Sequence, residues 1–425
     1  MRDAKFARPL PPDADAPLPG RPALLGHGQQ RNDGQELPTE EMVLNMGPSH
    51  PAMHGTVHLR LVLDGEKITS AGVSVGYLHR GFEKECEAHT WAENFPYTDR
   101  LNYVSPMLNN VGYALAVEKL LGVSAPARAQ WIRMIVGELA RLSDHLTYLG
   151  AQVMELGAFT PYFYVIKARE WVWDLLELVS GARLTHAYVR IGGVAADLPP
   201  DFAARTRETL ERLSAVVEEF DRLITRNRIF MDRMQGVAVI SADDAISHGW
   251  TGPCLRGSGV EYDVRKAHPY LFYDRVAFEI PIGANGDNMD RYLIRIEETR
   301  QSCAIIRQCL QQIEPGAIQL TDPRISLPTK AQAYNTIEGL INHFKLVVDG
   351  IEVPAGEVYS YTEAGNGELG FYLVADGSGR PVKCRCRPPC FMQMTALGHL
   401  LRGLNIADII PTFDTLNMIG GECDR

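Results

Sequence analysis

The chain has 425 residues and is 45% apolar, so it can bury a large core in one large domain or two ordinary ones. Its formal net charge of −10 argues against nucleic acid or an anionic lipid surface as a partner. Charged residues interrupt every apolar run well before the roughly 18 residues that a membrane-spanning helix needs, and the N-terminus has no apolar stretch of secretory length. We therefore expect a soluble or peripheral chain on the cytoplasmic side.

The N-terminal part is predicted to be an extension followed by a β-hairpin. Residues 1–41 are rich in Pro, Gly, Asp and Gln and lack apolar periodicity, which predicts a mobile extension. In the region 56–78, apolar residues alternate from Val57 to Leu63, and Asp64-Gly65 supplies a turn before the next apolar run. This alternation is typical of a hairpin with one buried face.

A helical body is predicted over residues 105–346. Ser105-Pro106 can supply a cap and a first helical residue, since a proline there lacks only an N–H that would be unpaired anyway. Apolar residues at spacings of three and four from Trp131 to Leu149 predict the next helix, with Gly150 as its end or as a kink. Further helices are expected over 160–181, 200–226, 287–313 and 330–346.

After residue 350 the pattern returns to short strands and turns, which predicts a β-rich C-terminal part over 350–425. Residues 42–425 are therefore expected to form a single domain of the α+β class. This domain is mainly helical and has β-rich flanks at both ends.

The segment GPSHPAMHGTVHL carries histidines at intervals of four, His50, His54 and His58. On a helix this spacing would place metal ligands on one face, but Pro48, Pro51 and Gly55 break any helix here. A rigid turn that holds one or two imidazoles in a cleft is the remaining functional interpretation. An ordinary loop histidine with satisfied hydrogen bonds is the alternative.

The eight cysteines form no disulfide framework, and reduced thiols are expected. Cys384 and Cys386 would face the same side of a strand with Cys390 close by, so three thiolates could bind zinc or iron with His399 or Cys423 as fourth ligand. The alternative is that these cysteines are small buried apolar residues.

Several segments resemble one known family in their order and spacing. They are GPSHPAMHGTVHL (47–59), GYLHRGFEK (76–84), YTDRLNYVS (97–105), AVEKLLG (116–122), LGAFTPYFY (156–164), VRIGGV (189–194), SGVEYDVRKAHPY (258–270), GELGFYLVADG (367–377) and GECDR (421–425). From about residue 42 to its end, the chain resembles the D subunit, or 49 kDa subunit, of respiratory complex I, the NADH-quinone oxidoreductase.

The resemblance implies a core similar to the large subunit of nickel-iron hydrogenases. Hydrogenase chemistry needs two Cys-x-x-Cys pairs, and this chain has none; Cys423 in GECDR is a lone thiol, which cannot hold a binuclear centre. The chain itself is therefore expected to bind no metal, cluster or flavin. It also lacks a glycine-rich nucleotide fingerprint after a strand, so NADH is expected to be oxidised elsewhere.

The resemblance further implies a quinone headgroup hydrogen-bonded by His54 and Tyr103. An imidazole that titrates near 6.5 and a phenol near 10 can both donate hydrogen bonds and protons, and quinone reduction consumes two protons. Glu155 matches a carboxylate, more often Asp in the family, that orients this histidine. In this role His54, Tyr103 and Glu155 are the expected catalytic residues.

Arg80 and Arg100 match arginines that the family places near the terminal 4Fe-4S cluster of the adjacent B subunit. The alternative is that both arginines form ordinary salt bridges, Arg100 with Asp99 or Glu93. Where the family often has a histidine near that cluster, this chain has Thr185 followed by His186. The resemblance therefore assigns no role to Thr185 or His186.

As a whole, the resemblance implies a core subunit that forms the quinone-reduction site with the B subunit and couples it to proton translocation. The expected partners are the B, C and I subunits and the membrane-embedded H subunit of the quinone channel, on the cytoplasmic face of the inner membrane. Two alternatives stay open: a non-catalytic assembly scaffold of the peripheral arm, and a hydrogenase-type metal enzyme, which the missing cysteine pairs oppose.

Overall fold

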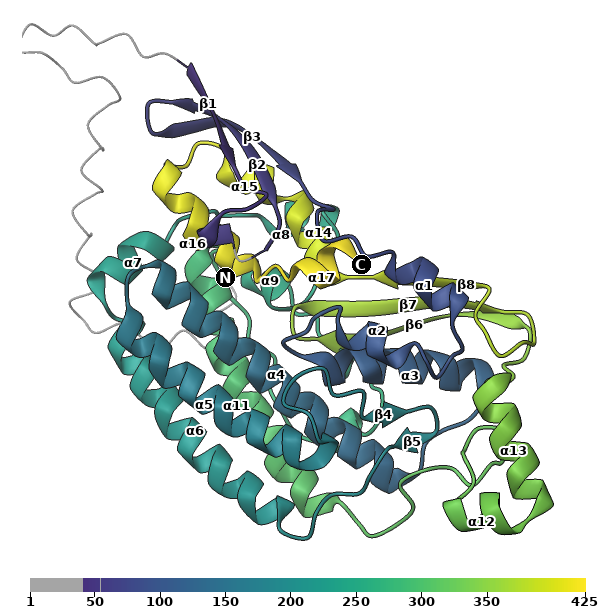
Figure 1. The fold of residues 1–425 in the computed structure, drawn as a ribbon. Helices are drawn as coiled ribbons and strands as arrows, with labels where there is room; N and C mark the ends of the chain where they lie inside the picture. Colours follow the sequence, from purple (N-terminus) through teal and green to yellow (C-terminus); the bar gives the residue numbers. More distant parts are fainter. Residues whose placement is uncertain (1–40, 54) are drawn as a thin grey trace, which may run out of the picture.

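The computed structural model describes residues 41–53 and 55–425. Apart from Glu41, the predicted extension lies outside the described residues. The described part is mainly helical and contains small antiparallel sheets, which agrees with the α+β class. Figure 1 shows the long helices side by side in the lower half, with the N-terminal sheet above them and a second sheet beside them.

The predicted N-terminal hairpin is confirmed and belongs to a three-stranded antiparallel sheet. Its strands, in the order β1-β2-β3, are β1 (Glu41–Met46), β2 (His58–Asp64) and β3 (Lys67–Ser74). Leu59, Leu61 and Leu63 are buried, as the alternation predicts, and Gly65 takes the positive φ that the tight turn requires. Strand β1 was not predicted.

Five long helices make up the body: α3 (Pro106–Leu121), α4 (Ala127–Glu155), α5 (Phe159–Ser180), α6 (Phe202–Ile224) and α11 (Asn288–Gln312). The helix start at Pro106 and the helix end before Gly181 are confirmed. Helix α4 packs against both α5 and α11 and is buried on nearly all sides, so it is the central helix of the body.

Gly150 does not end the helix, because α4 continues to Glu155. A Cβ atom at residue 150 would lie 3.1 Å from both Tyr162 Cδ2 and Val165 Cγ2 of α5. The glycine therefore allows close packing of two helices rather than ending one, a reason that depends on residues of another element.

A second three-stranded sheet, in the order β6-β7-β8, follows the body. Its strands are β6 (Gly356–Ala364), β7 (Gly367–Ala375) and β8 (Lys383–Arg387), and a short pair is formed by β4 (Val189–Arg190) and β5 (Gly193–Val194). The C-terminal part that we predicted as β-rich is thus β-structure only to Arg387. The chain then forms four short helices, one of which has a proline at its first position.

The remaining elements are short. They are the helices α1 (Phe82–Ala88), α2 (Phe95–Asp99), α7 (Arg228–Met234), α8 (Ala242–Ser247), α9 (Gly252–Gly257), α10 (Val264–Ala267), α12 (Lys330–Asn335), α13 (Ile337–Val348), α14 (Pro389–Thr395), α15 (Leu397–Leu401), α16 (Ile409–Leu416) and α17 (Gly420–Asp424), and the 3-10 turns η2 (Pro51–Met53), η3 (Tyr273–Arg275) and η4 (Ile406–Asp408).

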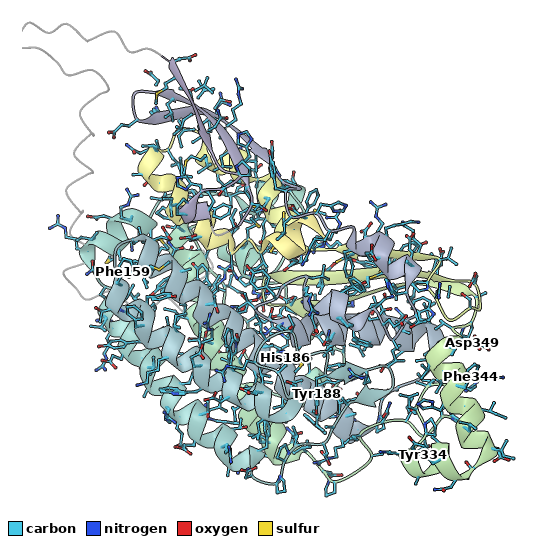
Figure 2. All side chains as sticks on the ribbon, in the orientation of Figure 1. Phe159, His186, Tyr188, Tyr334, Phe344 and Asp349 are labelled. Atoms are coloured by element: carbon cyan, nitrogen blue, oxygen red, sulfur yellow. The ribbon has the colours of Figure 1, made fainter. Side chains whose placement is uncertain are left out.

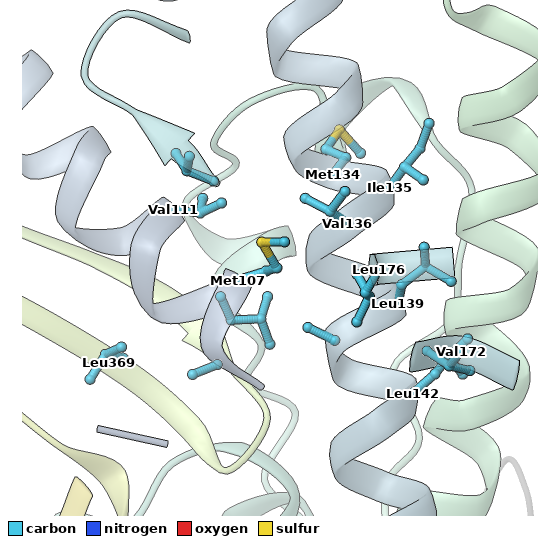
Figure 3. Packing of buried hydrophobic residues seen from close by; sticks show 14 of the residues in the cluster. Met107, Val111, Met134, Ile135, Val136, Leu139, Leu142, Val172, Leu176 and Leu369 are labelled. Carbon is cyan, nitrogen blue, oxygen red and sulfur yellow. The ribbon is translucent and has the colours of Figure 1, made fainter. Parts of the chain in front are cut away.

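Two apolar clusters hold these elements together. The larger one lies among α3, α4, α5, α11 and β7; Figure 3 shows Met107 of α3 between that helix and Val136 of α4, with Leu176 of α5 beyond. The smaller cluster joins the N-terminal sheet to the C-terminal helices α14–α17. The two ends of the described chain therefore share one core.

Candidate functional site

Tyr103 lies in the turn between α2 and α3, and a buried carboxylate holds this turn in place. Asn102 Nδ2 and Ser105 Oγ both donate to Asp144 Oδ2, at 2.7 and 2.8 Å. Asn417 Nδ2 donates to the other oxygen, Oδ1, at 2.8 Å. The residues on either side of Tyr103 are thus fixed to α4, while the Tyr103 side chain itself remains 38% exposed.

The surroundings of the Tyr103 hydroxyl favour its protonated form. Burial, followed by the charges of Cys390 and Asp144, raises the pKa of Tyr103, and the Arg80 guanidinium opposes this shift. Because the pKa lies above its already high ordinary value, the phenol stays a hydrogen-bond donor at neutral pH.

His54 lies outside the described residues, so its predicted pairing with Tyr103 stays a prediction. Its two sequence neighbours are placed: Met53 is fully buried, and a Cβ at Gly55 would lie 3.0 Å from Met418 Cε. Met53, Met418 and Val104, the residue after Tyr103, belong to the same apolar cluster. The segment that carries His54 and the turn that carries Tyr103 therefore pack on one cluster.

His58 does not share a helix face with His50, as the prolines and glycine indicate. It is the first residue of β2, and its Nε2 lies 3.0 Å from Asn45 Oδ1 of the neighbouring strand. The interpretation of the three histidines as a helical ligand set is therefore rejected.

Glu155 is the last residue of α4 and lies near a second carboxyl group that sequence analysis missed. Burial, and then the negative charge of Glu155, raises the pKa of Asp414 on α16 well above its ordinary value. Helix α16 packs against both α4 and the turn η2 that precedes His54. The acidic end of α4 and the turn that precedes His54 thus share a neighbour, and the contact between Glu155 and His54 stays a prediction.

Arg80 and Arg100 lie together, and their hydrogen bonds go to carbonyl oxygens. Arg80 Nη2 donates to the carbonyl oxygens of Arg100, at 2.6 Å, and Gly421, at 3.3 Å, while Arg100 Nη1 donates to Pro96 O at 2.6 Å. Burial and the charge of Arg100 lower the pKa of Arg80. Within the described part of the chain neither forms an ion pair, so the alternative of a salt bridge between Arg100 and Asp99 or Glu93 is not found.

His186 is buried close to the strand pair β4-β5, and Figure 2 shows it near the centre of the molecule, whereas the preceding Thr185 is half-buried. Burial lowers the pKa of His186 to about 4, so the ring is neutral at neutral pH. The next residue, Ala187, donates its backbone N–H to Asp99 Oδ2 at 2.8 Å, and burial raises the pKa of Asp99 to about 6.

The cysteines are buried free thiols. Cys384 and Cys386 do lie on the same, inward side of β8, as their spacing predicts, but the residues that the structure describes contain no group of three His, Cys, Asp or Glu side chains able to hold a metal ion. Cys390 Sγ instead accepts hydrogen bonds from Asn366 Nδ2 and the Ile419 amide, at 3.4 and 3.5 Å. The three-thiolate metal site is thus not supported.

Glu422, in the terminal GECDR segment, is fully buried behind Cys390. Its Oε1 accepts the Cys390 backbone N–H at 3.3 Å, and its Oε2 has no hydrogen-bond partner among the described residues. Burial, with a contribution from the charge of Asp144, raises the pKa of Glu422 to about 7. Below this pH the folded chain therefore holds a proton that the unfolded chain gives up above about 4.5.

The raised pKa of Glu422 predicts that its contribution to the free energy of unfolding decreases as pH rises from about 4.5 to 7. The decrease ends just above pH 7, where the folded group has ionised. Glu422→Gln removes this titration, so its unfolding free energy, relative to the parent chain, is expected to improve by about 3 kcal/mol between pH 4.5 and 8. Urea unfolding of both proteins at several pH values measures this difference. Glu208→Gln, on the exposed face of α6, is the control and should show no such trend; a constant offset for Glu422→Gln would contradict the prediction.

A network of buried charges at the centre of the molecule was not predicted. Arg256 Nη1 donates to Glu363 Oε1 at 2.9 Å, its Nη2 donates to Glu298, and His145 Nε2 lies 2.7 Å from Glu298 Oε2. Arg265 joins Asp263, at 2.6 Å, to Glu138, at 3.2 Å. The available signal was the run of Glu138, Arg141 and His145 at helical spacing on a helix, α4, that is buried on nearly all sides.

Comparison with known proteins identifies the family. The family model described as respiratory-chain NADH dehydrogenase, 49 kDa subunit, matches residues 155–425. A protein from Sorangium cellulosum, named as a D subunit of NADH-quinone oxidoreductase, is 59% identical over 391 residues, which cover 92% of this chain and 97% of the relative. Relatives from Anaeromyxobacter dehalogenans, 52% identical over the full length of both chains, and Myxococcus xanthus, 54% identical over 92% of this chain and 94% of the relative, are likewise named as D subunits.

These matches define the chain as a subunit of a respiratory oxidoreductase complex. It belongs to the family of the 49 kDa subunit of NADH dehydrogenase, whose bacterial relatives are named as D subunits of NADH-quinone oxidoreductase. In the part that the structure describes, no helix combines the length and the apolar character needed to cross a bilayer.

Proposed function

We propose that this chain, with the B subunit, forms the site where quinone is reduced and couples the reduction to proton translocation, and that Tyr103 and His54 hydrogen-bond the two carbonyl oxygens of the quinone. The observation that carries the proposal is the Tyr103 turn. A phenol is presented at the surface on a backbone segment that two side-chain hydrogen bonds fix to one buried carboxylate, Asp144. A group that must meet a ligand in one geometry benefits from such preorganisation.

The reaction adds two electrons and two protons to the quinone and forms two O–H bonds. The raised pKa of Tyr103 keeps its hydroxyl a donor to the carbonyl oxygen, which favours the electron-rich reduced headgroup. We assign the second donor to His54, with Glu155 stabilising the imidazolium form. The electrons are supplied by the terminal 4Fe-4S cluster of the B subunit.

Arg80 and Arg100 support a location of that cluster against this part of the chain. The charge of Arg100 lowers the pKa of Arg80, so the two cations lie close together, and the hydrogen bonds of both go to carbonyl oxygens in the described structure. A fixed positive charge stabilises a neighbouring cluster in its reduced state. We include the C and I subunits and the membrane-embedded H subunit among the partners, with the complex on the cytoplasmic face of the inner membrane.

Photolabelling of the assembled complex tests the proposal. With an azido-quinone, we expect covalent label on the peptide that contains Tyr103, and we expect unlabelled quinone to compete it away. Labelling confined to other subunits, or labelling of this peptide without competition, would leave the scaffold alternative as the better account.

A further inference from the structure

Helices α12 and α13 form a hairpin whose apolar side faces away from the molecule. Figure 1 shows the hairpin at the edge of the body, and Figure 2 shows Tyr334 and Phe344 on it. Tyr334 is 78% exposed, Ile337 73% and Phe344 62%. The hairpin surface is defined by the large apolar side chains there that are more than half exposed: Leu327, Tyr334, Ile337, Leu340, Ile341, Phe344, Val347 and Val348.

The orientation of α13 is the reverse of that expected for an amphipathic helix of a free protein. The residues of α13 that are half-buried are Gly339, Asn342 and Leu346, of which only Leu346 is a large apolar residue packed against the core. The six apolar residues of α13 within the hairpin surface recur at intervals of three and four and form one outward stripe. Helices normally bury such an apolar stripe, so we expect the stripe of α13 to be covered by another molecule.

The size of the hairpin surface matches a protein partner. Eight large side chains, each more than half exposed, leave on the order of 800 Å² of surface in water, which is about one partner's share of a standard interface. A helix with apolar anchors at such intervals fits the mode in which a helix inserts into an apolar groove.

The charge of the hairpin argues against a lipid surface as its occupant. Lys330 and Lys345 are offset by Glu338 and Asp349, so the hairpin has no excess of positive charge. Helices that lie on anionic membranes carry such an excess on their polar face. The stripe on α13 has no charged side chains. A charged group of another protein placed against it would be desolvated without forming an ion pair, so the partner surface is expected to be apolar and uncharged too.

We propose that α13 inserts into an apolar, uncharged groove on another subunit of the NADH-quinone oxidoreductase complex. Membership of the 49 kDa subunit family implies such neighbouring subunits, and the stripe and the area of the hairpin surface locate the contact on this chain. The inference rests on that membership and not on the quinone site, so photolabelling at Tyr103 and the tests below can fail independently.

Hydrogen exchange tests whether the hairpin surface is covered. Amides of residues 337–348 are expected to exchange at least about 10-fold more slowly in the assembled complex than in the isolated chain, because docking must open before they exchange. Equal rates in the two states would overturn the proposal.

A photo-crosslinker in place of Phe344 identifies the occupant in the assembled complex. A crosslink to a different subunit supports the proposal. A crosslink to a second copy of this chain, or to lipid alone, overturns it.

Matched substitutions separate the stripe from the rest of the helix. Leu340→Glu combined with Phe344→Glu is expected to reduce incorporation of this chain into the complex about 10-fold or more. His343→Glu adds an acid at an exposed position of the same helix outside the stripe and should leave incorporation unchanged. Because all three positions are exposed, thermal unfolding of the isolated chains should be unaltered; equal incorporation of both variants would contradict the proposed groove.

Discussion

Tyr103→Phe in the assembled complex is expected to lower quinone reduction by about 100-fold or more. The substitution removes one oxygen atom and leaves the ring, so the turn held by Asn102, Ser105 and Asp144 should keep its structure. NADH oxidation by an artificial acceptor should persist, because it does not need the quinone site. Steady-state assays of one preparation, with quinone and with the artificial acceptor, measure the ratio of the two activities.

The control for Tyr103 is Tyr372→Phe. Tyr372 lies half-buried on β7, where its hydroxyl donates to Glu357 Oε2 at 2.5 Å, far along the chain from the proposed site. Its loss should leave both activities unchanged. If Tyr103→Phe lowers the amount of assembled complex but not the quinone turnover of each complex, Tyr103 serves assembly and the proposed catalytic role fails.

Arg256→Leu is expected to destabilise the chain by about 3–5 kcal/mol. The Arg256 guanidinium is fully buried between Glu298 and Glu363, and the negative charges of both carboxylates raise its pKa. Removing the cation leaves those acids buried without their main partner. Chemical unfolding of the isolated chain, or loss of the soluble folded fraction if the variant does not fold, measures the cost.

Arg300→Leu provides the comparison, since Arg300 also pairs with several carboxylates, Glu218, Asp221 and Glu297, but is only half-buried. Its guanidinium nitrogens lie 2.8 Å from Glu218 Oε1, 2.7 Å from Asp221 Oδ2 and 3.2 Å from Glu297 Oε2, and its side chain is 27% exposed. Water reaches these pairs, and fully exposed ion pairs contribute only about 0–1 kcal/mol, so this variant should lose much less stability than Arg256→Leu. Similar losses for the two variants would show that burial does not decide the strength of these pairs.

Sequence patterns predicted the elements that are determined by neighbouring residues in the chain. Alternation from Val57 to Leu63 predicted the β2–β3 hairpin, and Ser105-Pro106 predicted the start of α3. Gly150 was misjudged because its role is contact with α5, and the helices after Arg387 were missed because each is short. The expected helix over 330–346 is divided in two because Thr336 has an extended backbone and caps α13 through its side chain.

The candidate site was predicted in part. Tyr103, Arg80, Arg100 and Glu155 came from the family resemblance, because no spacing connects residues so far apart in the chain. Asp144 and Asp414 were missed, since each reads locally as a polar residue of a helix and gains its role only from groups that distant segments contribute. The sequence feature that could have indicated them is a carboxylate inside a mostly apolar helix, because such a carboxylate needs hydrogen-bond partners from other parts of the fold.

The hydrogen bonds of the terminal segment have a consequence for the order in which the protein folds. Asp424 accepts the amides of Gly76 and Leu78 from 348 and 346 residues earlier, and Asn417 reaches Asp144 across 273 residues. Contacts of such separation form late, because the chain between them must first be ordered. The Tyr103 turn is bonded to α4 over only about 40 residues, whereas the loop with Arg80 is held by the end of the chain. We therefore expect the Arg80 loop to reach its final geometry later than the Tyr103 turn, after the helical body has formed.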